Sequence, residues 1–410
     1  MERLNFDIES DYAVKEMRRK SPRLSYGAIA SVLVMGMSLA TFAIILIKNY
    51  STDLDGHIHL LELHLYHGKF PVPPLYYSSL YLLKQIFSTN YKINTVLILS
   101  LSVLWKYKLS LKYIGNHTPL PKSDLVVALA VGGLMFFFPV YLPGIDGSKL
   151  YLGKFTPTIW HNSTSIFVFP FSLLLFFRSI KYIEQPNGKD LMQLFLLSVL
   201  ILMSKPSFLF AFVPVFPFIY IIRNRALDAG FVKIFGFCLF VISAIVFMGW
   251  WIYENGQIDN LLYGGEKTEV FLAPFEVWLN WTNVPFIDSI SSLLFLLAFV
   301  GVNHETLLKD WHFAYSSLLL IAGMLIFWLF AESGERFAHG NFYWQVPICM
   351  FIVYLVLIKH WIAKTELKAS LIETVKGLGR ADKILLGLFS LHVFSGGIYL
   401  FKLLYFGSFS

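Results

Sequence analysis

The chain of 410 residues carries a formal net charge of +7, with 56% hydrophobic and only 14% charged residues. Soluble domains average about 25% charged residues, so most of this surface must face lipid, and a string of soluble domains is excluded. Basic residues in contact with anionic lipid explain the positive charge, so we expect membrane lipids and no nucleic acid among the partners.

Eleven apolar runs are long enough to cross a membrane as helices of roughly 20 residues, which predicts an all-α polytopic bundle in a single domain. Before them, residues 1–25 are basic and lack an apolar core, so we expect a cytoplasmic tail and no cleavable signal peptide. The fifth and sixth runs meet at Ser204-Lys205-Pro206, so one of them is alternatively a re-entrant piece. The predicted spans, in chain order, are 26–48, 93–111, 125–143, 161–178, 190–204, 206–222, 232–253, 286–302, 313–331, 342–359 and 384–405.

The basic residues orient the bundle. With the N-terminus in the cytoplasm, more than two thirds of the 33 lysines and arginines fall on the cytoplasmic side, as the positive-inside rule requires. The two longest interspan segments, 49–92 and 254–285, then lie on the periplasmic side, away from ATP and nucleotide sugars. The short loops and the lack of a signal peptide favour the inner (plasma) membrane of a bacterium. There is no Walker motif, which argues against an ATP-driven pump.

The first outer segment, which contains STDLDGHIHLLELHLYHGKFPVPPLYY, predicts two short helices that lie flat at the membrane interface. Asp55 is a good N-cap for a helix over 56–67, and Gly68 is a good C-terminal stop. Three prolines follow and forbid its continuation. The tyrosine-rich run after them, from Tyr76 onward, predicts the second interfacial helix.

Titratable side chains gather in this segment. Asp53 and Asp55 lie close to the end of a span, where loss of water suits a carboxylate to general-base catalysis, and either can be the base. His59 lies four residues after Asp55 and three before Glu62, so these three side chains can bind a divalent metal, Mg²⁺ or Mn²⁺, or orient an imidazole. Alternatively these groups only solvate the end of a helix, and the sequence requires no cofactor.

Other outer segments supply candidates for substrate binding. Lys205 and Arg336 are cations on the side where basic residues are scarce, so they can hold a phosphate, although Arg336 can instead pair with Glu332 or Glu335. Trp160 is either an interfacial aromatic or a surface on which a sugar ring stacks. The segment 254–285 is acidic and aromatic, which suggests a lid or an acceptor platform. The complete set of candidate binding residues is His57, His59, Trp160, His161, Asn162, Lys205, Glu335, Arg336 and His339.

The TDLD stretch directly after the first span, followed by two short interfacial helices, resembles the GT-C superfamily of polytopic membrane glycosyltransferases. The resemblance implies transfer of a hexosyl or pentosyl group from a polyprenyl-phosphate donor to a glycan, lipid or protein acceptor on the outer face, as in the assembly of cell-envelope polysaccharide. It also implies that Asp53 or Asp55 deprotonates the acceptor hydroxyl, while Lys205 and Arg336 hold the phosphate.

Two other kinds of function remain open. A membrane glycan polymerase or an O-acyltransferase also uses polyprenyl-linked or acyl donors, but the single outer arginine and the lone candidate histidine, His392, disfavour both. A transporter or flippase of a lipid-linked substrate predicts ionisable residues at mid-bilayer depth. The predicted spans carry almost none, although prolines interrupt several of them.

Overall fold

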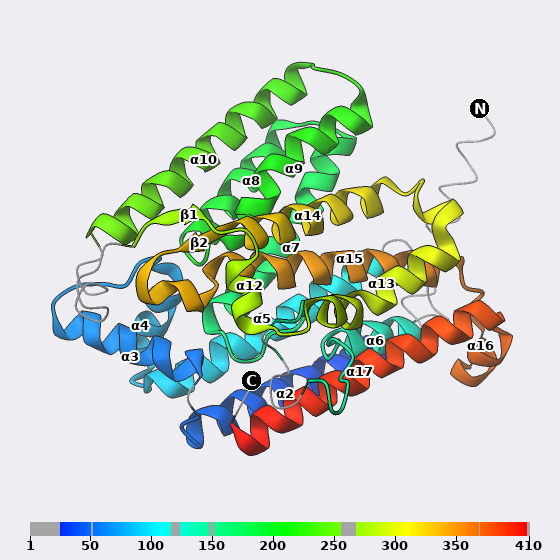
Figure 1. Cartoon of the computed structure of the whole chain (residues 1–410), viewed down its shortest axis with the longest axis horizontal. Helices are drawn as coiled ribbons and strands as arrows, with labels where there is room; N and C mark the ends of the chain where they lie inside the picture. The colour runs from blue at the N-terminus through cyan, green and yellow to red at the C-terminus, as the bar shows by residue number, and fades with distance from the viewer. Residues whose placement is uncertain are drawn as a thin grey trace.

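The computed structural model describes residues 25–50, 52–115, 124–146, 151, 153–255, 268–368 and 370–407. The predicted basic tail lies outside these residues except for Ser25, and so does part of the predicted outer segment 254–285. Within the described part the chain is almost wholly helical, as predicted, with one pair of short strands. Figure 1 shows most of the long helices lying along the long axis of the molecule.

Eight of the described helices are long and apolar enough to cross a membrane. They are α2 (Tyr26–Ile47), α7 (Ser163–Glu184), α9 (Ser207–Asn224), α10 (Ala229–Asn255), α13 (Pro285–Leu307), α14 (Trp311–Leu329), α15 (Gln345–Lys364) and α17 (Arg380–Phe406). The other elements are α3 (Asp53–Tyr66), α4 (Leu75–Phe87), α5 (Tyr91–Gly115), α6 (Asp124–Leu134), α8 (Gly188–Leu202), β1 (Val270–Leu272), α12 (Glu276–Trp281), β2 (Phe330–Glu332), the 3₁₀ helices η1 (Gly334–His339) and η2 (Asn341–Tyr343), and α16 (Leu371–Gly377).

Three of the eleven predicted spans are not among these eight helices. The span predicted at 93–111 corresponds to α5, which is 25 residues long but carries several lysines. The span predicted at 190–204 corresponds to α8, which has only 15 residues, and the one at 125–143 corresponds to α6, which has 11. The structure therefore supports a bundle with eight candidate spans and does not confirm a count of eleven.

The prediction of one continuous helix over 125–143 is wrong, because α6 ends at Leu134 and residues 137–142 have no regular secondary structure. Two adjacent glycines, Gly132 and Gly133, weaken the helix at that point, and Pro139 cannot continue it. The apolar composition of this run is correct for a buried segment, but composition alone does not distinguish a helix from buried extended chain.

The non-helical backbone of residues 137–142 finds hydrogen-bond partners within the protein. His392 Nδ1 lies 2.6 Å from the carbonyl oxygen of Phe138, whose own N–H donates back to the His392 carbonyl at 3.2 Å. The N–H of Tyr141 donates to Ser395 Oγ at 3.0 Å. Non-helical backbone is tolerated inside a membrane bundle only where protein groups make hydrogen bonds to its N–H and C=O groups. These contacts therefore hold α17 and residues 137–142 together. His392 is thus a helix-packing residue.

Helix α15 is the centre of the bundle. Its buried residues run unbroken from Gln345 to Lys359, so it is covered on every side. Helices α5, α6, α7, α9, α13 and α14 pack against it, and α17 contacts it through the hydrogen bond from Trp361 Nε1 to the Asp382 carboxylate. By contrast, α10 leaves most of its apolar side chains exposed, as a helix that faces lipid does.

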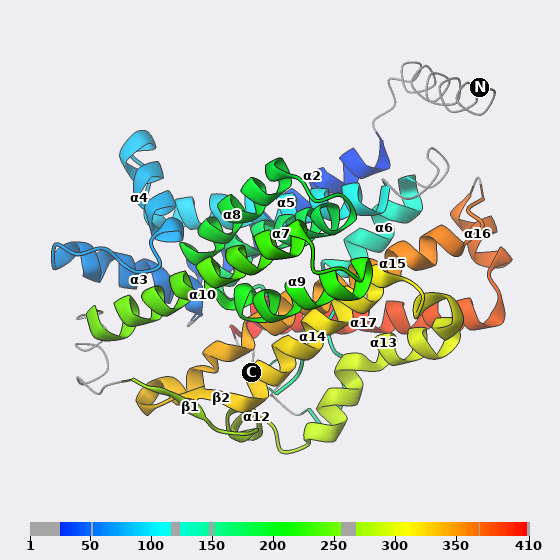
Figure 2. The same ribbon diagram turned by 90° about the horizontal axis from the view of Figure 1, so that it is seen from above.

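The two short helices that follow the first span are present as predicted. In Figures 1 and 2, α3, α4 and the β1–β2 pair lie toward one end of the long axis and α16 lies at the other. The strands are antiparallel, with Val270 opposite Glu332. The predicted start of the first short helix is wrong, because α3 begins at Asp53 with Thr52 as its N-cap. Asp55 therefore lies in the first turn, where its carboxylate interacts favourably with the positive end of the helix dipole.

The contact between α17 and residues 135–142 generates a prediction with a matched control. A methyl group at Gly396 would lie 1.5 Å from the carbonyl oxygen of Phe136, whereas one at the adjacent Gly397 would meet nothing within 4 Å. Gly396→Ala should therefore cost at least about 1–3 kcal/mol of stability, and Gly397→Ala almost nothing. Thermal unfolding of both variants in detergent, followed by tryptophan fluorescence, measures the difference. Equal melting temperatures for the two variants would contradict this packing.

Candidate functional site

A cavity of about 630 Å³ lies at the end of the bundle where α2 and α14 end and where α7, α9 and α15 begin. This volume falls within the range of about 300–1,000 Å³ that is usual for small-molecule sites. Seven of the predicted site residues line it, namely Asp53, His57, His59, His161, Asn162, Lys205 and His339. They come from four segments that are far apart in the sequence, so the bundle brings together most of the side chains that the sequence analysis selected.

Asp53, Asn162 and Lys205 form a hydrogen-bonded chain along one wall of the cavity. Asn162 donates through Nδ2 to the Asp53 carboxylate, and Lys205 Nζ donates to Asn162 Oδ1 at 3.0 Å. Asn162 is itself fixed, because it is the N-cap of α7 and its Oδ1 accepts from the N–H of Ser165 at 3.0 Å. One amide therefore holds a carboxylate and an ammonium group at set positions without joining them directly.

Lys205 is held in place by further contacts. Its Nζ donates to Thr164 Oγ1 at 3.2 Å and lies 4.4 Å from the ring centroid of Trp344. Burial lowers the pKa of Lys205 to about 7, and the attraction of Asp53 opposes that effect. An anion that enters the cavity would stabilise the charged form, so this lysine is suited to bind a phosphate.

Two histidines of the cavity are neutral near pH 7. Burial lowers the pKa of His57 and of His161 to about 4, against the opposing effect of Asp53. His57 Nδ1 lies 2.7 Å from the hydroxyl oxygen of Tyr77, and His161 Nδ1 lies 2.8 Å from that of Tyr399. These imidazoles can therefore act as hydrogen-bonding groups around Asp53, but they carry no positive charge toward a phosphate.

The other predicted residues lie outside the cavity lining. Asp55 is 43% exposed, and its carboxylate lies 3.7 Å from Lys92 Nζ at the surface. Trp160 is only 2% exposed and packs against Phe42 and Phe136, so it is neither an interfacial aromatic nor a wall of the cavity. The predicted sugar-stacking role of Trp160 is therefore not supported.

Arg336 reaches the cavity only indirectly. Its Nη1 lies 3.9 Å from Oε1 of the buried Glu332, which is the alternative pairing that the sequence allowed. The same carboxylate accepts a hydrogen bond from Asn341, which does line the cavity. Glu335 is exposed on η1 and is not part of the lining.

The predicted metal ligands do not gather. Asp55 contacts Lys92, and neither Asp55 nor Glu62 lines the cavity into which His59 extends. Within the described residues, no group of three or more His, Cys, Asp or Glu side chains is arranged to hold a metal ion. A divalent metal therefore stays a prediction. Measuring sugar transfer with and without a chelator tests it.

The sequence analysis missed the aromatic wall of the cavity. Tyr151, Phe327, Tyr343 and Trp344 line it, together with Trp281 from the segment that was expected to serve as a lid or acceptor platform. One feature of the sequence could have indicated this wall. Tyr343 and Trp344 follow the candidate binding residue His339 within five residues, in HGNFYWQ.

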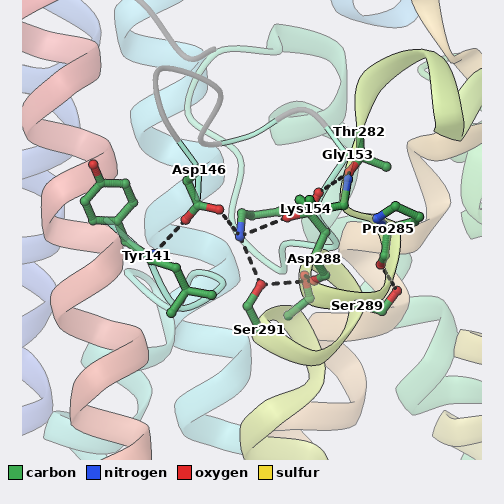
Figure 3. A network of polar contacts seen from close by, with 12 residues as sticks. Tyr141, Asp146, Gly153, Lys154, Thr282, Pro285, Asp288, Ser289 and Ser291 are labelled. Carbon is green, nitrogen blue, oxygen red and sulfur yellow. Dashed lines mark hydrogen bonds and ion pairs between the residues drawn. The ribbon is translucent and has the colours of Figure 1, made fainter. Parts of the chain in front are cut away.

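A buried ion network fixes the part of this wall that contains Tyr151 and Gly153 (Figure 3). Lys154 Nζ lies 2.8 Å from Asp146 Oδ1 and 3.2 Å from Asp288 Oδ1, and it donates to Ser291 Oγ at 2.9 Å. The side chain of Lys154 is 1% exposed, so its charge depends on these partners.

The backbone around Lys154 is fixed as well. Tyr343 donates its hydroxyl to the Lys154 carbonyl at 2.9 Å, and Trp278 Nε1 donates to the Gly153 carbonyl at 2.8 Å. Gly153 has φ = +86°, and a methyl group there would lie 2.7 Å from Cβ of Thr282, so only glycine fits. These hydrogen bonds connect residues 153 and 154 to Tyr343 and to Trp278 of α12, so they hold neighbouring parts of the cavity lining together.

These features define a class. The described chain forms a nearly all-α integral membrane protein with a polar and aromatic cavity at one end of its helix bundle. No protein-family model matches the chain, and no curated protein matches it. The chemistry of the cavity is therefore what points to a function.

The ion network generates a stability prediction. Lys154→Met leaves the buried Asp146 and Asp288 carboxylates without their cation, so the protein should lose about 3–5 kcal/mol of stability. The triple variant that adds Asp146→Asn and Asp288→Asn removes the unpaired charges and should recover part of the loss. Thermal unfolding in detergent measures both effects, with Lys189→Met at an exposed position as the control. A single variant as stable as the wild type would show that the network does not hold the wall.

Proposed function

We propose that this protein is an integral membrane glycosyltransferase that moves a sugar from a polyprenyl-phosphate donor to an acceptor hydroxyl on the periplasmic face of a bacterial inner membrane. The observation that carries the proposal is the Asp53–Asn162–Lys205 chain in one cavity, because a base and a phosphate-binding cation at fixed positions are the two groups that this reaction needs.

In the proposed reaction, the acceptor hydroxyl oxygen attacks the anomeric carbon of the donor sugar, and the hydroxyl proton passes to the Asp53 carboxylate. The bond between that carbon and the phosphate oxygen breaks, and polyprenyl phosphate leaves with the bonding electrons. Lys205 compensates the negative charge that grows on the leaving phosphate. Asn162 keeps both groups in place, so neither must reorganise as the charge develops.

The geometry favours Asp53 over Asp55 as the base. Asp53 lines the cavity and accepts from Asn162, whereas Asp55 lies at the surface beside Lys92. The sequence alone left these two carboxylates equivalent. Lys205 likewise takes the phosphate-binding role in the proposal, with Arg336 supporting Asn341 through Glu332.

The alternatives are less well supported. The O-acyltransferase interpretation depends on His392, which is stacked on Phe137 and bonded to the Phe138 carbonyl away from the cavity lining. A transporter of a lipid-linked substrate is favoured by one observation, the buried Lys106 of α5, whose Nζ lies 3.7 Å from the ring centroid of Phe169. Lys106 does not line the large cavity, so we keep the transporter as the second candidate.

The two aspartates supply a matched test of the base. Asp53→Asn removes a proton acceptor and should lower the transfer rate by at least about 10²-fold, while Asp55→Asn should change it less than about twofold. The measurement follows release of polyprenyl phosphate by the protein in lipid nanodiscs, with a panel of polyprenyl-phosphate sugars and a crude acceptor extract.

Each reaction is run with added Mg²⁺ or Mn²⁺ and again with a chelator, which tests the predicted metal. Equal loss of activity in the two asparagine variants, or loss only in Asp55→Asn, would contradict Asp53 as the base. No turnover by the wild type with any donor would shift the assignment to the transporter.

Donor binding should depend on pH through Lys205. Below its pKa of about 7 the lysine is already charged, so the dissociation constant should be constant. Above pH 7 the lysine must take up a proton to bind the phosphodiester, so the affinity should fall as pH rises, by up to about tenfold per pH unit. The measurement is titration of a donor analogue into nanodiscs between pH 6 and 9.

Two variants test whether Lys205 causes the pH dependence of donor binding. Lys205→Met should bind weakly and without a slope, and the double variant His59→Gln, His339→Gln should keep the slope although it removes two other titratable groups of the cavity. A flat wild-type profile over this range would contradict the role of Lys205.

A further inference from the structure

Trp281 differs from the other aromatic residues of the cavity lining in its ring contacts. Trp281 is half-buried and lines the cavity, and no ring-to-ring contact involves it among the described residues. Trp278, three residues earlier on α12, is only 8% exposed, packs against Phe155 and Trp328, and donates its Nε1 to Gly153. Of two tryptophans on one short helix, Trp278 is buried among other aromatic residues and Trp281 belongs to the cavity lining.

The other rings of this wall already have partners. The Tyr343 ring contacts the rings of Tyr151, Phe327 and Trp344, and the Lys205 ammonium group lies 4.4 Å from the ring centroid of Trp344. Among the described aromatic residues of the lining, Trp281 is therefore the one without a ring partner.

The position of Trp281 is rigid. The N–H of Ala273 donates to the Leu329 carbonyl at 2.9 Å, which continues the β1–β2 pairing and ties the start of the α12 segment to the end of α14. At the other end of α12, Thr282 donates to the Asp288 carboxylate of the ion network. A platform held at both ends loses little conformational entropy when a ligand stacks on it.

We propose that the acceptor is a neutral carbohydrate and that one of its sugar rings stacks on Trp281. This inference rests on the function proposed above and names its acceptor class. The electron-rich face of an indole attracts the partly positive C–H groups on one face of a pyranose ring. Asn341, whose Nδ2 donates to Glu332, keeps an amide oxygen that can accept from a sugar hydroxyl. A lipid or a peptide acceptor would not need this combination.

The first test measures binding without any donor, so it is independent of catalysis. Neutral disaccharides of hexoses and N-acetylhexosamines are titrated into the full-length protein in nanodiscs and followed by saturation-transfer NMR. The wild type should bind at least one of them, Trp281→Ala should raise that dissociation constant about tenfold, and Trp281→Phe should recover most of the affinity. The control is Trp250→Ala, at a residue of α10 that is 54% exposed, which should bind as the wild type does.

The second test uses transfer. With the sugar that binds as acceptor, Trp281→Ala should raise the acceptor KM about tenfold and leave the dissociation constant of the donor within about twofold of the wild type. Absence of sugar binding by the wild type, or equal binding by Trp281→Ala, would overturn the acceptor assignment. Transfer to a lipid or peptide hydroxyl with no effect of Trp281→Ala would overturn it as well. Failure of donor turnover in the presence of sugar binding would instead count against the proposed transferase and leave the carbohydrate site standing.

Discussion

Non-helical backbone inside a membrane bundle must find its hydrogen-bond partners within the protein, and the candidate site depends on how this chain meets that requirement. After α6 ends at Leu134, the chain continues as non-helical backbone beside α17, where His392 and Ser395 bond to it. The chain then reaches Lys154, whose charge is buried between two carboxylates.

The cavity lining has a charged part and an aromatic part. In one part of the lining a single amide, Asn162, holds the side chains of Asp53 and Lys205 at fixed positions without a direct ion pair between them. The aromatic part adjoins it, because the ring centroid of Trp344 lies 4.4 Å from Lys205 Nζ, and hydrogen bonds from Tyr343 and Trp278 to the carbonyls of Lys154 and Gly153 hold that part of the lining. Preorganisation of this kind is what transition-state stabilisation demands, because fixed groups do not have to move while charge develops.

Two lysines, Lys154 and Lys205, lie in different environments. Lys154 has two carboxylate partners at 2.8 and 3.2 Å, so its position is fixed and it is not available to a ligand. Lys205 is held only by neutral oxygen atoms and an aromatic ring, and burial lowers its pKa to about 7. A lysine in that second environment gains from an incoming anion, which is the physical reason for assigning the phosphate to Lys205.

The sequence by itself determined the class of the protein, the pair of short helices after the first span, and most of the polar residues of the cavity. These follow from hydropathy, proline positions and the scarcity of charge, which are properties of local sequence. It did not determine the break after α6, the burial of Trp160, the position of Asp53 but not Asp55 in the cavity lining, or the aromatic wall. Those depend on which side chains from distant segments meet, as when Asn162 selects Asp53 or when Gly396 makes room for the Phe136 carbonyl. Such contacts are set by the packing of the whole bundle, and no window of sequence contains both partners.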